Sequence, residues 1–135
     1  MVEKAGCHVI YGLRGLKTHS KITLVVRRDE DGIRRYVHLG TGNYNDQTAK
    51  LYTDMGLLTC SKPIGEDATA VFNMLSGYSE PPYWNKLVVA PIWLRDRFLK
   101  LIDRETEHAR QGKPARIIAK MNSLCDKKII AALYE

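Results

Sequence analysis

Two alternating segments joined by a tight turn constrain the fold of this chain more than any other feature. In residues 21–28, every second side chain is a branched apolar one, which is the period of a strand with one buried face. Residues 29–32 read Asp-Glu-Asp-Gly and end in the Asp-Gly pair typical of a hairpin turn. Residues 33–39 then return as a second strand. We therefore expect a mixed α/β (α+β) fold whose sheet is centred on this β-hairpin, with helices packed against it.

Three later segments have features of helices. Apolar residues recur three and four positions apart in residues 68–75, and Gly77 ends the pattern. Residues 94–102 repeat this spacing before a glycine and a proline break it. Residues 123–126 resemble a capping box, which predicts a helix that starts there and carries the apolar residues of 129–133.

Two short apolar runs, residues 7–11 and 115–121, are predicted to be strands, the second of them buried. A strand at 115–121 needs partner strands that the chain does not contain, so we interpret the sequence as an internal piece of a longer protein. Residues 80–82, Glu-Pro-Pro, are the clearest linker. We place a domain boundary there, which divides the chain into residues 1–82 and 83–135.

Composition narrows the class of protein. The net charge of +6 attracts polyanions, but it does not separate nucleic acid from other phosphate-rich partners. No apolar run approaches the roughly 18 residues that cross a bilayer. The chain has an odd number of cysteines, Cys7, Cys60 and Cys125. They lie far apart in the sequence, and no pair has the spacing of metal ligands. These features predict a reducing, cytoplasmic compartment.

The densest chemistry lies just before the hairpin. In an extended chain Lys17, His19 and Lys21 point to the same side, because alternate residues share a face. A neutral imidazole is a nucleophile, and flanking ammonium groups offset the charge on phosphoryl oxygens. The same spacing also fits an ordinary surface strand with basic residues.

A glycine-rich turn, Gly40-Thr41-Gly42-Asn43, follows the hairpin. Glycines let the backbone approach a phosphate closely, and the asparagine side chain can hydrogen-bond oxygens or orient His19. H-x-K followed by G-[ST]-x-N resembles the phospholipase D superfamily, which uses histidine as a nucleophile on phosphorus. That superfamily has an aspartate five residues after the lysine, where this chain has Val26.

A longer match covers essentially the whole chain. Residues 15–21, 36–45, 51–54, 120–124 and 129–130 resemble the catalytic region of the long polyphosphate kinases. Those enzymes contain two phospholipase D-like domains that lack the aspartate, so valine at position 26 agrees with the match. The resemblance implies the latter part of the first domain and the beginning of the second.

This resemblance implies reversible transfer of the terminal phosphate of ATP to inorganic polyphosphate through a phosphohistidine, with Mg²⁺. Its arginines associated with magnesium would precede Met1, and a second arginine and histidine that contact ATP would follow Glu135. We therefore expect no metal ligand within the chain and little activity from the chain alone. The implied site residues are catalytic His19, Lys21 and Asn43, ATP-binding Tyr52, and phosphate-binding Lys17, Gly40, Thr41 and Gly42.

The implied partners are ATP, ADP and inorganic polyphosphate, with no nucleic acid. A homo-oligomeric full-length form and a peripheral association with membranes are further expectations. One alternative is a phosphodiesterase or nuclease of the phospholipase D type, which should carry an acid in place of Val26. Another is a basic polyanion-binding module, for which Tyr36 and Tyr44 are the only aromatic candidates near the hairpin. His38 is expected opposite the face of its apolar neighbours, in a structural role or in support of the site.

Overall fold

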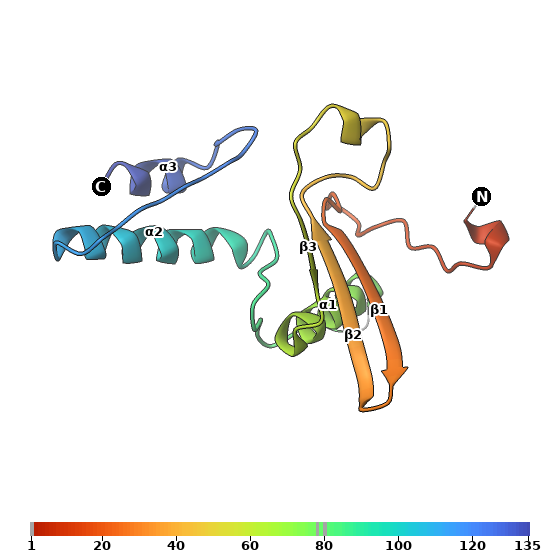
Figure 1. The fold of residues 1–135 in the computed structure, drawn as a ribbon. Coiled ribbons are helices and arrows are strands. Elements are labelled where there is room, and N and C mark those ends of the chain that lie inside the picture. The colour runs from red at the N-terminus through yellow and green to blue at the C-terminus, as the bar shows by residue number, and fades with distance from the viewer. Residues whose placement is uncertain (1, 78, 80) are drawn as a thin grey trace. The chain divides into compact units, whose positions relative to one another are not determined.

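The computed structural model describes residues 2–77, 79 and 81–135, and Figure 1 shows its elements. Contacts along the chain define two compact units, Met1–Leu87 and Val88–Glu135. The first unit holds the sheet and α1, and the second holds α2 and α3. Short 3₁₀ turns, η1 (Glu3–Ala5) and η2 (Thr48–Lys50), lie in the connections of the first unit.

The sheet of the first unit is antiparallel and is built on the predicted hairpin. Strand β1 (Lys21–Asp29) pairs with β2 (Gly32–Gly40), and β2 pairs with β3 (Gly56–Thr59), in the order β1-β2-β3. Asp29 faces Gly32 at the turn, and Lys21 faces Gly40 at the other end. Gly32 has a φ of 119°, which explains glycine at the end of this turn. The hairpin prediction is confirmed, whereas β3 was not predicted.

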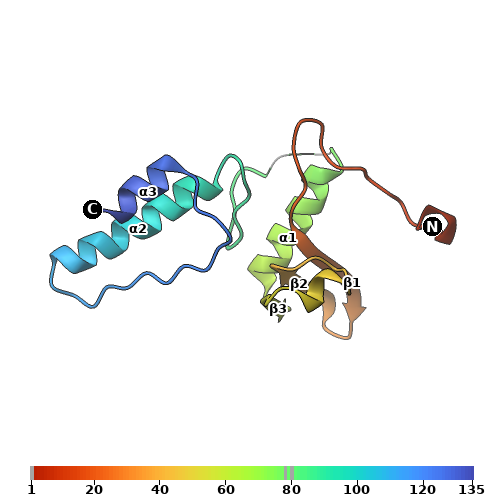
Figure 2. The same ribbon diagram turned by 90° about the horizontal axis from the view of Figure 1, so that it is seen from above.

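Helix α1 (Lys62–Leu75) covers one face of the sheet, as Figures 1 and 2 show. The core between helix and sheet contains Val37 and Ala68, which are 1% and 0% exposed. Gly65 permits the close approach, because a Cβ atom there would lie 2.8 Å from the Cβ atom of Arg35. The core-facing residues of β1 alternate with a second set, Lys21, Thr23, Val25 and Arg27. This second set therefore lies on the face of the sheet that α1 does not cover.

A buried carboxylate joins α1 to the end of the first unit. Asp67 is 2% exposed and accepts hydrogen bonds of 2.7–2.9 Å from the backbone N–H groups of Asn85, Lys86 and Leu87, and from the Asn85 side chain. Burial alone would raise the pKa of Asp67, but these hydrogen bonds outweigh it and lower the pKa. The chain beyond the proline pair is therefore tied back to α1 as far as Leu87.

The second unit consists of α2 (Leu94–Arg110) and α3 (Lys127–Leu133), which pack side by side (Figure 2). Ile102, at 7% exposure, lies on the buried face of α2. The connection between the helices is held in part by Glu105, whose carboxylate accepts a hydrogen bond from the backbone N–H of Arg116 at 3.2 Å.

Three local predictions were wrong. Residues 7–11 and 115–121 form no strand, and 115–121 are exposed. Their composition suits a strand, but a strand needs a neighbour for its N–H and C=O groups, and the described residues supply none. The last helix begins at Lys127, because the carboxylate of Asp126, rather than Ser123, accepts hydrogen bonds from the backbone of Lys128 and Ile129.

Candidate active site

His19 and Lys21 are in direct contact at the start of β1. The Lys21 ammonium nitrogen lies 2.9 Å from Nδ1 and 3.3 Å from Nε2 of His19. It also donates a hydrogen bond of 2.8 Å to the carbonyl oxygen of His19. Both residues are exposed enough to meet a ligand, since this contact lies at the surface. The arrangement places a positive charge beside the imidazole ring of His19.

The sheet places a second imidazole next to this pair. Lys21 faces Gly40 on β2, which faces Gly56 on β3, so this row of the sheet has a side chain at only one position. His38 belongs to the next row whose side chains lie on the same face, and its ring leans over the two glycines. A Cβ atom on Gly40 would lie 3.3 Å from Cε1 of His38, and one on Gly56 would lie 2.9 Å from Nε2. The predicted placement of His38 opposite its apolar neighbours is confirmed.

The glycine-rich turn is fixed by the segment that carries Tyr52. The backbone N–H of Thr41 donates to the carbonyl oxygen of Met55 at 3.0 Å, and the Met55 N–H donates to the Thr41 hydroxyl at 2.9 Å. That hydroxyl donates in turn to a carboxylate oxygen of Asp54 at 3.0 Å. A Cβ atom on Gly42 would lie 2.2 Å from the other carboxylate oxygen, so a side chain there would force the turn or Asp54 to move. Glycine at this position is thus explained by the neighbouring carboxylate of Asp54.

The remaining expected site residues are less closely connected. The carbonyl oxygen of Asn43 accepts a hydrogen bond from the N–H of Asn45 at 2.8 Å. Lys17 is exposed, and Tyr52 is 58% exposed. Within residues 2–77, 79 and 81–135, no hydrogen bond or ion pair joins any of these three residues to His19. Their roles at the site stay predictions.

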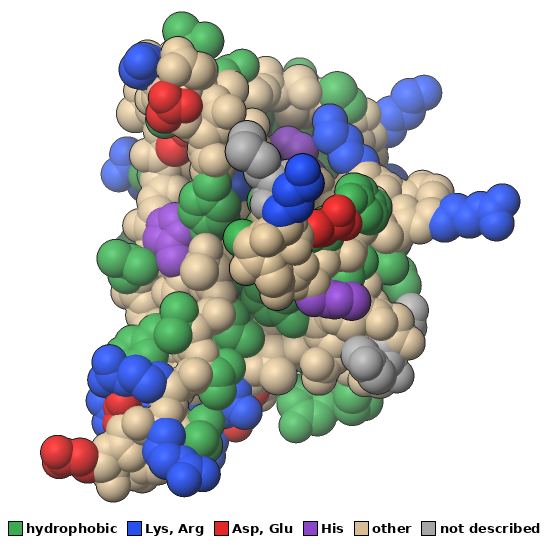
Figure 3. All heavy atoms as spheres, turned by 90° about the vertical axis from the view of Figure 1, so that its right-hand side faces the viewer, with side chains coloured by type: hydrophobic (Ala, Val, Ile, Leu, Met, Phe, Trp, Pro, Cys, Tyr) green, Lys and Arg blue, Asp and Glu red, His purple; other side chains and the backbone are tan. Residues whose placement is uncertain are grey.

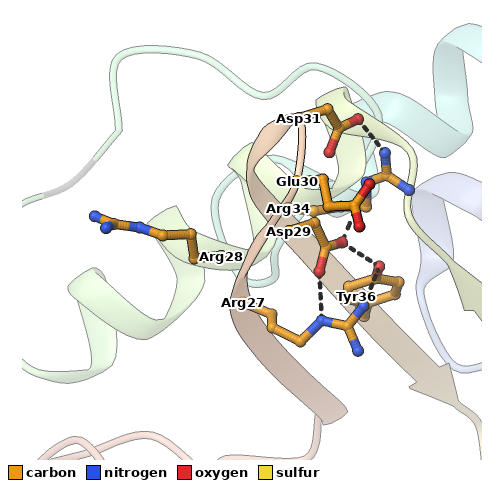
Figure 4. Close-up of a pocket in the computed structure, with 7 residues that line it drawn as sticks. All are labelled: Arg27, Arg28, Asp29, Glu30, Asp31, Arg34 and Tyr36. Carbon is orange, nitrogen blue, oxygen red and sulfur yellow. Dashed lines mark hydrogen bonds and ion pairs between the residues drawn. The ribbon is translucent and has the colours of Figure 1, made fainter.

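A shallow hollow at the turn of the hairpin holds a balanced set of charges, shown in Figure 4. The Arg27 guanidinium bonds Asp29 at 2.5 Å and lies over the Tyr36 ring, 5.2 Å from its centroid. The Tyr36 hydroxyl donates to the other oxygen of Asp29 at 2.5 Å, and Arg34 pairs with Asp31. The hydrogen bond from Arg27, followed by that from Tyr36, lowers the pKa of Asp29. Since these arginines are already paired, the hollow is a weak candidate for a polyanion.

The wider surface and composition add three observations. Figure 3 shows lysine and arginine side chains scattered over this face of the molecule, among neutral and acidic ones. Among the described residues, no group of three or more histidine, cysteine, aspartate or glutamate side chains could hold a metal ion. No helix in the described part of the chain is long and apolar enough to cross a membrane.

Comparison with known protein families gives two matches that together span most of the chain. Residues 1–81 match the model described as polyphosphate kinase C-terminal domain 1. Residues 87–135 match the model described as polyphosphate kinase C-terminal domain 2. The order of the two matches along the chain is that of the two units of the structure.

Individual relatives agree. The chain is 66% identical over 134 residues to the polyphosphate kinase of Halalkalibacterium halodurans and 58% identical to that of Thermosynechococcus vestitus. The two alignments include 99% of this chain but only 19% and 18% of the length of those proteins. The crystal structure of polyphosphate kinase from Porphyromonas gingivalis matches with a TM-score of 0.85 and 34% identity, over 98% of this chain and 22% of that one. The expected mixed α+β fold class is thereby confirmed.

Proposed function

Because this chain belongs to the polyphosphate kinase family, we propose that it carries the phosphoryl-accepting histidine of an enzyme that transfers phosphate between ATP and inorganic polyphosphate. The chain spans about a fifth of the length of its curated relatives, so the activity belongs to the longer protein. The observation that carries the proposal is the contact between the Lys21 ammonium group and the ring of His19, at 2.9 Å.

Phosphoryl transfer in this proposal takes place in two displacements. A ring nitrogen of His19 attacks the γ-phosphorus of ATP, the P–N bond forms, and the bond from phosphorus to the bridging oxygen breaks to release ADP. A terminal oxygen of polyphosphate then attacks the same phosphorus, the P–N bond breaks, and the polymer gains one phosphate. Both steps are reversible, because histidine is a good leaving group from phosphorus.

Lys21 supports both displacements electrostatically. Negative charge spreads over the equatorial oxygens of the transferring group, and a positioned cation stabilises that charge. The hydrogen bond from Lys21 to the carbonyl oxygen of His19 holds the ammonium group beside the ring before the phosphoryl group arrives. The same contact keeps the positive charge in place after transfer.

The other predicted residues complete the proposed site. Lys17 and the turn from Gly40 to Gly42 would bind phosphate oxygens, Asn43 would orient the phosphoryl group, and the exposed ring of Tyr52 would contact ATP. Magnesium, when bound with ATP, offsets the charge of the phosphates. Its ligands would come from other parts of the protein, as would the contacts of a homo-oligomer. Cytoplasmic location and peripheral membrane association also stay predictions.

The two alternative functions have weaker support. Phosphodiesterases of the phospholipase D type should carry an acid at position 26, where this chain has Val26. Val26 pairs with Arg35 across the hairpin and lies on the same face of the sheet as the core residue Val37. A basic binding module should present unpaired cations on the sheet, whereas Arg27 bonds Asp29. Neither feature counts against transfer through a histidine.

Labelling of the full-length protein with γ-phosphate-labelled ATP tests the proposal. We expect a label that is stable in base and labile in acid, as a phosphohistidine is, and that is absent from a folded His19→Gln variant. Thr18→Ala and Ser20→Ala are matched controls on either side of the histidine and should keep the label. Acid-stable label on Ser20, or full labelling of the His19→Gln protein, would overturn the proposed intermediate.

A further inference from the structure

Residues 41–55 join β2 to β3 and form a loop beyond one end of the sheet (Figure 1). The two ends of this 41–55 loop are joined at its base, where Thr41 and Met55 exchange hydrogen bonds of 2.9–3.0 Å. Tyr52, with 58% of its surface exposed, lies between this base and the 3₁₀ turn η2. The position of the Tyr52 ring therefore depends on what holds the loop.

The hydroxyl of Tyr44 attaches the first part of this loop to the sheet. It accepts a hydrogen bond from the Thr23 hydroxyl on β1 at 3.1 Å, and its oxygen lies 2.8 Å from Nδ1 of His38 on β2. The rings of Tyr44 and His38 are 5.6 Å apart between centroids. Thr23 and His38 face each other in the hairpin, so a single hydroxyl group joins the loop to both strands.

Hydrogen bonds within the loop connect Tyr44 to the residue before Tyr52. Asn45 follows Tyr44, and its side-chain oxygen accepts a hydrogen bond from the backbone N–H of Thr48 at 2.9 Å. The carbonyl oxygen of Thr48 accepts a hydrogen bond from the N–H of Leu51 at 3.0 Å, and Leu51 precedes Tyr52. Each of these bonds restrains the backbone torsions between its ends, so an attachment at Tyr44 also limits the positions open to Tyr52.

We propose that Tyr44 is a positioning residue for nucleotide binding, whose hydroxyl holds the 41–55 loop on the sheet so that the Tyr52 ring is in place before ATP arrives. The inference rests on the contact between Tyr52 and ATP in the proposed function. An aromatic ring binds a nucleotide by stacking on its base. A ring that is already held in its bound position loses less conformational entropy on binding, so the affinity is higher.

Calorimetric titration of the full-length protein with a non-hydrolysable analogue of ATP provides the test. Tyr44→Phe keeps the ring but removes the hydroxyl, and we expect the Kd of the analogue to rise about fivefold, the effect of one lost hydrogen bond. The rate of labelling at saturating ATP should stay unchanged. Thr23→Val removes one of the two partners of the hydroxyl and should raise the Kd by less. Tyr36→Phe is the matched control, because its hydroxyl bonds Asp29 near the turn of the hairpin, and it should leave the Kd unchanged.

A double-variant comparison distinguishes positioning of Tyr52 from a general structural role. Tyr52→Ala should raise the Kd about tenfold, and Tyr44→Phe should have no further effect in that background, because no ring is left to position. The inference is overturned if Tyr44→Phe binds the analogue as tightly as wild type, if it raises the Kd equally in the Tyr52→Ala protein, or if it slows labelling at saturating ATP.

The outcomes separate this inference from the proposed function. Wild-type affinity in the Tyr52→Ala protein would refute the contact between Tyr52 and ATP, and the inference with it. Absence of label on His19 would concern only the proposed phosphoryl transfer, because the titration with the analogue involves no transfer.

Discussion

The ammonium nitrogen of Lys21 lies 2.9 Å from Nδ1 of His19 and 2.8 Å from the carbonyl oxygen of the same residue. An ammonium group can only donate, so the nearer ring nitrogen, Nδ1, is the acceptor in this contact. In the proposed transfer, the second hydrogen bond would let Lys21 remain in place while one of its protons turns from the ring to an incoming phosphoryl oxygen. Lys21 would then be positioned for the charge before the substrate arrives.

We predict that Lys21→Met slows the labelling of His19 about a hundredfold, the range seen when one positioned donor to a transition state is removed. A time course of labelling with γ-phosphate-labelled ATP, quenched at successive times, measures this rate. Arg28→Met is the matched control, because it removes one positive charge from the same strand, and Figure 4 shows Arg28 pointing away from its neighbours. Equal losses in the two variants would mean that overall charge, rather than the contact with His19, is responsible.

Gly42→Ala should destabilise the first unit. The new methyl group would lie 2.2 Å from a carboxylate oxygen of Asp54, so either the turn or Asp54 must move and the Thr41–Asp54 hydrogen bond is lost. We expect the free energy of unfolding, from denaturant titration, to fall by about 1–3 kcal/mol. Asp54→Ala in the same chain removes the clash. The double variant should then lose less stability than the two single variants together.

Asp67 should make the stability of the chain sensitive to acid. Although burial opposes ionisation, the hydrogen bonds from residues 85–87 lower the pKa of Asp67 below its unfolded value of 3.8. A lowered folded pKa gives stability that is complete above the unfolded pKa and is lost as the pH falls through the folded pKa. Asp67→Asn should therefore lose about 2 kcal/mol near neutral pH and show a flatter acid limb in denaturant titrations. Glu66→Gln, an exposed neighbour on α1, should leave both unchanged.

The phenol of Tyr36 should ionise later than an ordinary tyrosine. Its hydrogen bond to Asp29, the largest cause, raises the pKa of Tyr36 above 10.0. A raised folded pKa gives stability that is present below the unfolded pKa and is lost as the pH rises through the folded pKa. The ultraviolet titration of wild type minus Tyr36→Phe isolates this phenol. Asp29→Asn should shift that titration toward lower pH, and a curve unaffected by Asp29→Asn would refute the assigned cause.

Local signals account for what could be predicted from the sequence. Alternation and an Asp-Gly turn define the hairpin within twenty residues, and the contact between His19 and Lys21 needs only the spacing of two residues. Strand β3 has four residues and no turn signal linking it to β2, so nothing local indicates it. Residues 7–11 and 115–121 resemble strands in composition alone.

Contacts between distant segments account for what could not be predicted. Asp54 lies thirteen residues beyond Thr41 in the chain and accepts a hydrogen bond from its hydroxyl. The same carboxylate occupies the space beside Gly42. Tyr44 joins Thr23 across twenty-one residues, and Asp67 accepts from the backbone of Lys86 across nineteen. Each of these contacts depends on the folded arrangement of the chain, because no spacing rule relates such positions in a single sequence.

The short connection of the hairpin has a consequence for how the protein is made. Only two residues separate β1 from β2, so the entropy lost on closing this loop is small, and hairpins of this kind form in about 1–10 μs. Ribosomes add roughly 5–20 residues per second, which leaves about a second or more between completion of β2 and the emergence of β3. During that interval the nascent chain presents Lys21 opposite Gly40 with one edge of β2 still unpaired. Chaperones that bind unpaired strand edges would bind the nascent chain at this stage of synthesis.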